Sequence, residues 1–221
     1  MKYKWLNKEN NNKLIIFFNG WGMDEGVVKH LKFDDYDVVM FYDYNTLDTD
    51  FVLDKKYPEV NIVAWSMGVN IAGVNIAGVN TGVNTGVNRI GVTFGNISKI
   101  VVINGTLKPI DEKYGIPPRI YDMTIAGFDE KSRDKFINNM GINSKDISYL
   151  LFNRTLENQK SELLALKNYK ANLEFKPAKI YISEDDRIIP TKNQCAFWGI
   201  EPNLKGGHYP FLNFARWGDI L

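Results

Sequence analysis

One buried-strand pattern runs directly into a serine, in the segment Val60-Asn61-Ile62-Val63-Ala64-Trp65-Ser66-Met67-Gly68. Its first six residues are mostly apolar without alternation, which is typical of a strand buried on both faces of a parallel sheet. Small residues, Ala64 and Gly68, stand two positions before and after Ser66. A small-x-Ser-x-Gly pattern between a strand and a helix predicts a sharp turn that presents a nucleophile, although Ala64 replaces the usual first glycine.

Four further apolar runs extend this pattern in both directions along the chain. They are Leu14–Phe18, Asp37–Tyr42, Lys99–Gly105 and Lys179–Ser183. Helical patterns separate several of the runs, and strands that alternate with helices predict right-handed βαβ units in an α/β fold. We therefore expect a mostly parallel central sheet flanked by helices, in a single domain that spans residues 1–221.

The regular spacing of strands breaks between Gly105 and Pro177. Residues 106–176 contain no convincing strand, whereas 129–139 and 155–169 have helical patterns. An insertion at the carboxyl ends of parallel strands would lie over the usual ligand crevice of such a sheet. We therefore expect residues 106–176 to form a helical lid insertion; the alternative is two packed helices without a pocket.

A tandem repeat of Gly-Val-Asn units follows the serine and continues from Gly68 to Asn88. Glycine in a helix interior costs about 1 kcal/mol relative to alanine, and valine and asparagine are also poor helix formers. The pattern therefore predicts a weak helix, and we expect the segment after about Thr81 to be the most mobile part of the domain.

The composition excludes several classes of protein. Among the 221 residues, 44% are hydrophobic, and 27 Lys and Arg against 26 Asp and Glu give a net charge of +1. A chain this apolar and this close to neutral is not a disordered protein, and it has no electrostatic case for binding nucleic acid. The single cysteine, Cys195, excludes an internal disulfide and a multi-cysteine zinc site. With no signal peptide or membrane-spanning run apparent, we expect a cytoplasmic monomer that binds no membrane.

A nucleophilic serine needs a base, which is usually histidine. Of the two histidines, His30 falls in an early helical stretch, whereas His208 follows two glycines near the C-terminus and suits a loop at the crevice. Where such a serine turn sits on an α/β sheet, the chain order is serine, acid, histidine. Asp186 follows the last predicted strand with suitable spacing, and Asp185 is the rival. The predicted catalytic residues are Ser66, Asp186 and His208.

Two backbone N–H groups must stabilise the oxyanion of the intermediate. One belongs to the residue after the nucleophile, Met67, and the other to the glycine-rich loop after the first predicted strand, where we expect it to be that of Trp21. This loop lacks the Lys-Ser/Thr pair of a phosphate-binding loop. We expect no metal and no organic cofactor, because hydrolysis by serine needs neither.

Four motifs give the sequence a family resemblance. Phe17 to Asp24, Ala64 to Val69, Ile103 to Thr106 and Gly207 to Phe211 resemble the BioG-type pimeloyl-[acyl-carrier protein] methyl ester esterases of biotin synthesis. The resemblance covers nearly the whole chain, and the repeat is the main departure from it. It implies an α/β-hydrolase that demethylates pimeloyl-[acyl-carrier protein] methyl ester and releases methanol. It also implies that Ser66 is the nucleophile, His208 the base and Asp186 the acid, with Trp21 and Met67 as oxyanion donors.

Two other functions stay open at this stage: a hydrolase of another acyl ester or thioester, and an inactive hydrolase fold that serves as a binding protein. An acyl-carrier protein partner is acidic, so we expect basic side chains near the pocket mouth. Between positions 154 and 176 there are five basic residues and three acidic ones. The basic residues are Arg154, Lys160, Lys167, Lys170 and Lys176, and we expect several of them to steer the carrier protein.

Overall fold

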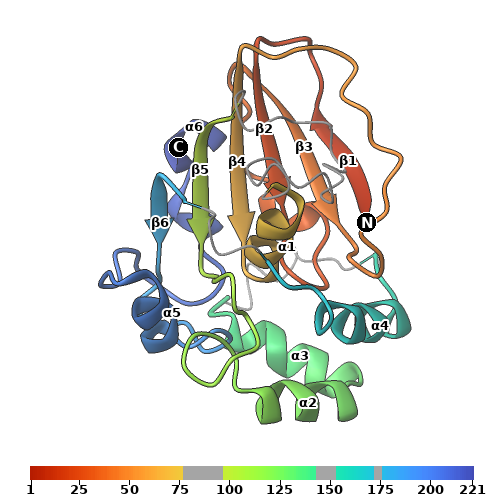
Figure 1. The fold of residues 1–221 in the computed structure, drawn as a ribbon, viewed down its shortest axis with the longest axis vertical. Helices are drawn as coiled ribbons and strands as arrows, with labels where there is room; N and C mark the ends of the chain where they lie inside the picture. The colour runs from red at the N-terminus through yellow and green to blue at the C-terminus, as the bar shows by residue number, and fades with distance from the viewer. Residues whose placement is uncertain (77–96, 143–152, 172–175) are drawn as a thin grey trace, which may run out of the picture.

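A six-stranded sheet forms the centre of the computed structural model, which describes residues 1–76, 97–142, 153–171 and 176–221 (Figure 1). The strand order is β1-β3-β2-β4-β5-β6; β1 is antiparallel to β3, and every other pair is parallel. The strands are β1 (Lys2–Asn7), β2 (Lys13–Phe18), β3 (Tyr36–Tyr42), β4 (Glu59–Trp65), β5 (Ile97–Ile103) and β6 (Lys179–Tyr181).

The five predicted strands correspond to β2 to β6, and the mostly parallel α/β sheet is confirmed. The N-terminal strand β1 was not predicted. Its sequence, Lys-Tyr-Lys-Trp-Leu-Asn, starts by alternating lysine with aromatic residues, and Lys2 and Lys4 are exposed. An edge strand with one solvated face alternates in this way, so a search for continuous apolar runs does not find it.

The helices flank the sheet and extend beyond one end of it. They are η1 (Glu25–Val28), α1 (Met67–Ile76), α2 (Pro118–Ala126), α3 (Glu130–Asn139), α4 (Leu156–Leu166), α5 (Thr191–Trp198), η5 (Phe211–Asn213) and α6 (Trp217–Ile220). Two of the helices have N-cap residues whose side chains accept hydrogen bonds from N–H groups of the first turn. Asp129 forms a capping box with Ser132 at the start of α3, and Thr155 accepts from the Asn158 N–H at the start of α4. These two helices match the predicted ones, whereas α2 was not predicted.

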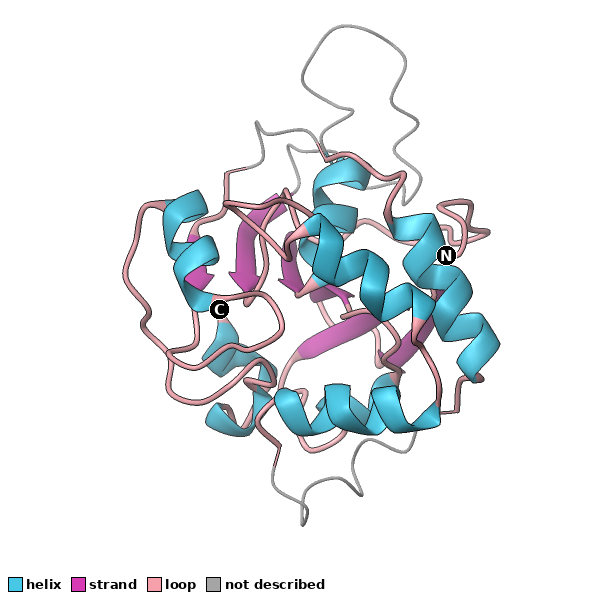
Figure 2. Cartoon of the chain, turned by 90° about the horizontal axis from the view of Figure 1, so that it is seen from below, coloured by secondary structure: helices cyan, strands magenta, loops and turns pink. Residues whose placement is uncertain are grey.

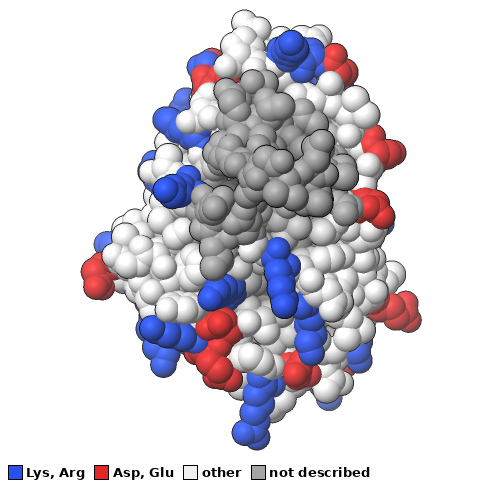
Figure 3. Space-filling model, in the orientation of Figure 1, with Lys and Arg blue, Asp and Glu red and all other residues white. Residues whose placement is uncertain are grey.

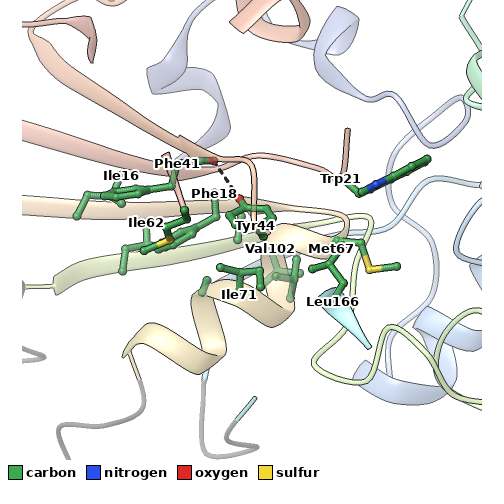
Figure 4. Close-up of a cluster of buried hydrophobic side chains, with 14 of the residues drawn as sticks. Ile16, Phe18, Trp21, Phe41, Tyr44, Ile62, Met67, Ile71, Val102 and Leu166 are labelled. Carbon is green, nitrogen blue, oxygen red and sulfur yellow. Dashed lines mark hydrogen bonds between the residues drawn. The ribbon is translucent and has the colours of Figure 1, made fainter. Parts of the chain in front are cut away.

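Alternate residues of the parallel strands build two apolar cores, one on each face of the sheet. Ile16 and Phe18 belong to one core and Ile15 and Phe17 to the other, and all four are fully buried. Figure 4 shows part of the first core, to which strands β2 to β5 and helix α1 contribute side chains such as Phe18, Phe41, Val102 and Ile71. This burial on both faces explains why these strands are continuously apolar.

Residues 106–176 supply α2, α3 and α4, which lie beyond the carboxyl ends of the parallel strands (Figure 1). The view from below in Figure 2 shows helices across this end of the molecule. The described part of the insertion contains these three helices joined by loops, and its action as a lid stays a prediction.

The repeat begins inside α1, which ends at Ile76. Residues 77–96 lie outside the described residues, and the predicted mobility after Thr81 concerns only those. Elsewhere, none of the helices that the structure describes combines the length and the apolarity that crossing a membrane requires.

A buried network of charges joins the insertion to the end of β3. Arg154 lies between two carboxylates, with Nη1 at 2.8 Å from Glu162 Oε2 and Nη2 at 3.2 Å from Asp43 Oδ1. Lys2 Nζ lies 2.9 Å from Asp43 Oδ2. Burial raises the pKa of Asp43, but hydrogen bonds from Lys2 and Asn45 and the charge of Arg154 outweigh burial and bring this pKa to about 2.

Close packing at Gly68 generates a first prediction. A Cβ atom at Gly68 would lie 2.3 Å from the carbonyl oxygen of Phe18 and 2.5 Å from that of Asn19, and neither backbone atom can move freely. Gly68→Ala should therefore lower the free energy of unfolding by about 2 kcal/mol, measured by urea denaturation. The matched control is Gly127→Ala, whose Cβ would meet its nearest atom at 3.4 Å. Equal losses in both variants would contradict the close-packing explanation.

The network also predicts a pH dependence of stability. Because the folded-state pKa of Asp43 lies below its ordinary value, ionised Asp43 stabilises the fold above pH 4, and this contribution is lost as the pH falls toward about 2. Asp43→Asn should lower the free energy of unfolding at pH 7 by about 1 kcal/mol after allowance for solvent screening.

The difference between the Asp43→Asn variant and the parent should shrink in urea denaturation below pH 4. Asp122→Asn, which removes an exposed ion pair with Lys167, is the control and should change stability by less than about 0.5 kcal/mol. A difference for Asp43→Asn that is the same at pH 7 and pH 3 would show that its charge does not stabilise the fold.

Candidate active site

Ser66 lies in the turn between β4 and α1, at the carboxyl end of the central parallel strands. Its φ of +59° is in the left-handed region, and its N–H donates to the Ile103 carbonyl at 3.0 Å. A non-glycine residue in this region stores strain, which persists only where the surroundings fix it. Here Gly68 and Gly105 let neighbouring backbone pack closely around the turn and fix the conformation of Ser66. A Cβ at Gly105 would lie 2.4 Å from the Ser66 carbonyl oxygen, so only glycine fits there.

The structure brings Ser66, His208 and Asp186 together. His208 Nε2 lies 2.8 Å from Ser66 Oγ, and His208 Nδ1 lies 2.8 Å from Asp186 Oδ2. All three residues are buried, with 1% of His208 exposed. In this arrangement the imidazole can take the serine proton at Nε2 while the carboxylate holds the proton on Nδ1.

Asp186, and not Asp185, faces the histidine. Asp186 Oδ1 accepts the N–H groups of Ile188 at 2.9 Å and Ile189 at 3.0 Å, which fixes the carboxylate. By contrast, the Asp185 side chain is 66% exposed and pairs with Arg187 at 3.1 Å. Geometry therefore favours Asp186 as the acid over its rival.

Three residues that the sequence did not single out as functional hold this group in place. The Gln194 side chain donates to Asp186 Oδ2 at 2.8 Å, while Trp65 Nε1 and Asn104 Nδ2 each donate to the His208 carbonyl at 3.0 Å. Asn104 directly follows β5 and has a φ of +45°, and its amide also donates to Ser183 Oγ at 2.8 Å. A polar residue directly after a buried strand is a signal that could have found Asn104, but Gln194 gives no such signal.

The two predicted oxyanion donors, Trp21 and Met67, line the same cavity as Ser66. Within the described residues, their backbone N–H groups donate to no protein acceptor. The Trp21 side chain is fixed, because its Nε1 donates to the Gln159 carbonyl at 2.8 Å and its ring contacts Phe128 and Phe136 edge to face. Trp21 thus anchors its loop through the indole and leaves its main-chain N–H available.

The cavity beside Ser66 has a volume of about 310 Å³. It lies between the strand ends and the insertion, and its lining is mostly apolar, with Ile120 and Tyr121 from α2, Phe136 from α3 and Leu163 from α4. Burial and the nearby Glu162 carboxylate raise the pKa of Tyr121, so its hydroxyl stays protonated and donates to the Leu163 carbonyl at 2.9 Å. Such a cavity suits an apolar chain rather than a charged group.

The basic residues nearest this cavity differ from the predicted set. Lys135 and Arg187 line it, whereas none of the predicted basic residues does. The prediction was wrong for Arg154, because this guanidinium is buried between Glu162 and Asp43 and cannot meet a partner. Lys167 is exposed and pairs with Asp122 at 2.6 Å, as Arg187 pairs with Asp185 at 3.1 Å. Figure 3 shows basic side chains interspersed with acidic ones over this end of the molecule.

No group of three or more His, Cys, Asp or Glu side chains in the described part of the chain is placed to hold a metal ion.

Comparison with known proteins gives matches over the full length of the chain. The model of the family described as "Pimeloyl-ACP methyl esterase BioG" matches residues 1–100 and 94–220. A Bacteroides fragilis protein named "Malonyl-[acyl-carrier protein] O-methyltransferase" is 34% identical over 205 residues, which cover 88% of this chain and 39% of that protein. An uncharacterised Haemophilus influenzae protein is 29% identical over 231 residues, covering 100% of this chain and 99% of the other.

Solved structures agree with the family match. The crystal structure of BioG from Haemophilus influenzae superposes with a TM-score of 0.82 at 29% identity, covering 100% of this chain and 99% of that one. A lipase-esterase related protein from Clostridium acetobutylicum has a TM-score of 0.60 at 12% identity over 94% and 92% of the two chains, and this likeness shows the fold alone. From its full-length family match and its α/β-hydrolase fold, the chain belongs to the BioG family of pimeloyl-ACP methyl esterases.

Proposed function

We propose that this protein is a serine carboxylesterase that demethylates pimeloyl-[acyl-carrier protein] methyl ester in biotin synthesis. The observation that carries the proposal is the hydrogen-bonded chain from Ser66 Oγ through His208 to Asp186, with 2.8 Å at each step, at the wall of an apolar cavity. Membership of the BioG family supports a hydrolase of this kind. The name of the Bacteroides relative describes methyl transfer to an acid carried by an acyl-carrier protein, which is the opposite change at the same kind of group.

The reaction would proceed in two steps. Ser66 Oγ attacks the ester carbonyl carbon as its proton passes to His208 Nε2, and the backbone N–H groups of Trp21 and Met67 stabilise the oxyanion. The C–O bond to the methoxy group then breaks, and methanol leaves with the proton from His208. In the second step water attacks the acyl-enzyme, again losing a proton to His208, and releases the free carboxylate and Ser66. Asp186 holds the imidazole and stabilises its charged form, and the chemistry needs no metal or cofactor.

The partner and the setting belong to the same proposal. The apolar cavity would hold the acyl chain, and the carrier protein would dock outside it, next to the exposed side chains of Lys135 and Arg187. We place the enzyme in the cytoplasm as a monomeric single domain, with residues 106–176 acting as a lid over the acyl chain.

A hydrolase of another acyl ester or thioester is the second candidate, because the three catalytic groups do not measure acyl length. Methanol release from pimeloyl-[acyl-carrier protein] methyl ester, compared with shorter and longer diacid methyl esters, tests the choice. Preference for the pimeloyl ester supports the proposal, and equal rates on all chain lengths would contradict its substrate. An inactive binding protein would show no hydrolysis of any ester.

The proposed triad predicts the effect of single substitutions. Ser66→Ala and His208→Ala should each lower kcat by roughly 10³-fold or more while the circular dichroism of the protein is unchanged. Asp186→Asn should cost a comparable or slightly smaller factor, because the imidazole loses its orienting carboxylate. Asp185→Asn is the matched control and should keep nearly full activity. Loss of activity in Asp185→Asn but not in Asp186→Asn would overturn the assignment of the acid.

Docking of the carrier protein predicts a salt-dependent effect of charge reversal. Lys135→Glu with Arg187→Glu should lower kcat/KM for the carrier-bound ester, most at low salt, because exposed charges act on association and are screened by ions. Cleavage of a small free methyl ester should fall less and should show little dependence on salt, because that substrate does not dock through the carrier protein. The comparison variant reverses the charges of Lys160, Lys167 and Lys170, which lie on and beside α4 and which the sequence analysis predicted as docking residues. This variant should have the smaller effect. Equal losses on both substrates would contradict docking at either set.

A further inference from the structure

Helix α4 of the insertion is hydrogen-bonded to the loop after β2, which carries Trp21. Gln159 accepts from the Trp21 indole N–H at its carbonyl, at 2.8 Å, and its side-chain Nε2 donates to the Gly22 carbonyl at 3.0 Å. Glu162 Oε2 accepts from the Gly22 N–H at 3.0 Å. Both backbone polar groups of Gly22 are therefore held by side chains that lie more than a hundred residues later in the chain.

The Glu162 carboxylate is completely buried and joins two loops of the sheet. Its Oε1 accepts from the Tyr44 N–H at 2.7 Å in the loop after β3, while its Oε2 accepts from Gly22 in the loop after β2. Burial raises the pKa of Glu162, and the Arg154 charge and the two backbone donors oppose this effect. A buried carboxylate is costly unless it is fully paired, so each of these contacts is needed to keep the group in place.

From these contacts we propose that Gln159 and Glu162 are positioning residues that fix the Trp21 backbone N–H for the oxyanion. The oxyanion hole would then be completed by the helical insertion and not by the sheet alone. The inference rests on the proposed function, in which Trp21 donates to the oxyanion.

The conformation of the loop explains why it needs these contacts from Gln159 and Glu162, which together we call the clamp. Gly22 has a φ of +73°, a region open to glycine, and Gly20 precedes Trp21, so the peptides on both sides of Trp21 could rotate if nothing held them. The Gly20 N–H is held by the Asn19 side chain at 2.8 Å, the Trp21 indole by Gln159, and Gly22 by both α4 side chains. An oxyanion donor contributes only when it is aimed before the charge develops, and loss of one such donor costs about 10²- to 10³-fold in kcat.

The test uses two variants, each of which removes or weakens one side-chain contact to Gly22 and leaves the bond from the Trp21 indole to the Gln159 backbone carbonyl in place. Gln159→Met keeps the length of the side chain but removes its N–H donor, and leaves the charge network intact. Glu162→Gln keeps the shape but removes the charge. Because Glu162→Gln leaves the buried Arg154 partly unpaired and so destabilises the fold, Gln159→Met is the variant that decides the inference. Glu157→Gln, an exposed position on the same helix, is the matched control.

Four quantities are measured for each folded variant: kcat and KM for the carrier-bound methyl ester, the affinity for a trifluoromethyl ketone, and the affinity for an ether analogue of the substrate. The ketone becomes a tetrahedral oxyanion on Ser66, whereas the ether has no carbonyl and reports binding alone. We expect kcat to fall about tenfold to a hundredfold and ketone binding to weaken by a similar factor. KM and ether binding should change less than about twofold, and Glu157→Gln should match the parent in every measurement.

Two results would overturn the inference. Unchanged kcat and ketone binding in folded Gln159→Met would show that the Gln159 side chain does not position the donor. Parallel weakening of ether and ketone binding would show a general structural role. Ser66→Ala separates these results from failure of the proposed function: if Ser66→Ala keeps its esterase activity, the proposed function itself is wrong. If Ser66→Ala is inactive and the clamp variants are unaffected, only the clamp is wrong.

Discussion

The close approach of the β4–α1 turn to the end of β2 is the constraint on which the site depends. Gly68 lies so near the carbonyls of Phe18 and Asn19 that no side chain fits there, and Gly105 lies equally near the carbonyl of Ser66. These contacts hold Ser66 at a positive φ, with its Oγ against His208. The same approach brings the loop that carries Trp21 next to the serine, so one packing constraint sets both the nucleophile and the donor proposed for the oxyanion.

Patterns local in sequence predicted the parts of the fold that local physics determines. Strands β2 to β6 are continuously apolar because both faces are buried, and α3 and α4 begin at capping residues that are visible in the sequence. Strand β1 was missed because Lys2 and Lys4 are exposed and its other residues are only half-buried. Residues such as Gln194 and Glu162 could not be found in this way, because their roles depend on partners brought close only by the tertiary fold. The same limit explains the error at Arg154, since a basic residue on an amphipathic segment gives no sign that two carboxylates bury it.

The buried charges of Arg154, Glu162 and Asp43 are a poor source of stability alone, because removing charged groups from water costs free energy. An apolar core of the same volume is often as stable as a buried ion pair, so such groups are frequently kept for specificity rather than for stability. In this protein Glu162 provides what an apolar side chain cannot, because it accepts from the backbone of two separate loops and pairs with Arg154 at the same time. The insertion is thereby tied in one orientation to the strand ends where Ser66 lies.

This tie gives the two parts of the molecule different tasks. The sheet and its loops bring together Ser66, His208 and Asp186, an arrangement that by itself does not measure the length of an acyl chain. The insertion supplies the apolar wall of the cavity through side chains such as Tyr121, Phe136 and Leu163. Because α4 both lines the cavity with Leu163 and holds Gly22 with Glu162, a change that shifts α4 to suit another acyl chain would also move the loop of Trp21. If the proposed function holds, selection of the substrate and stabilisation of the transition state are coupled through one helix.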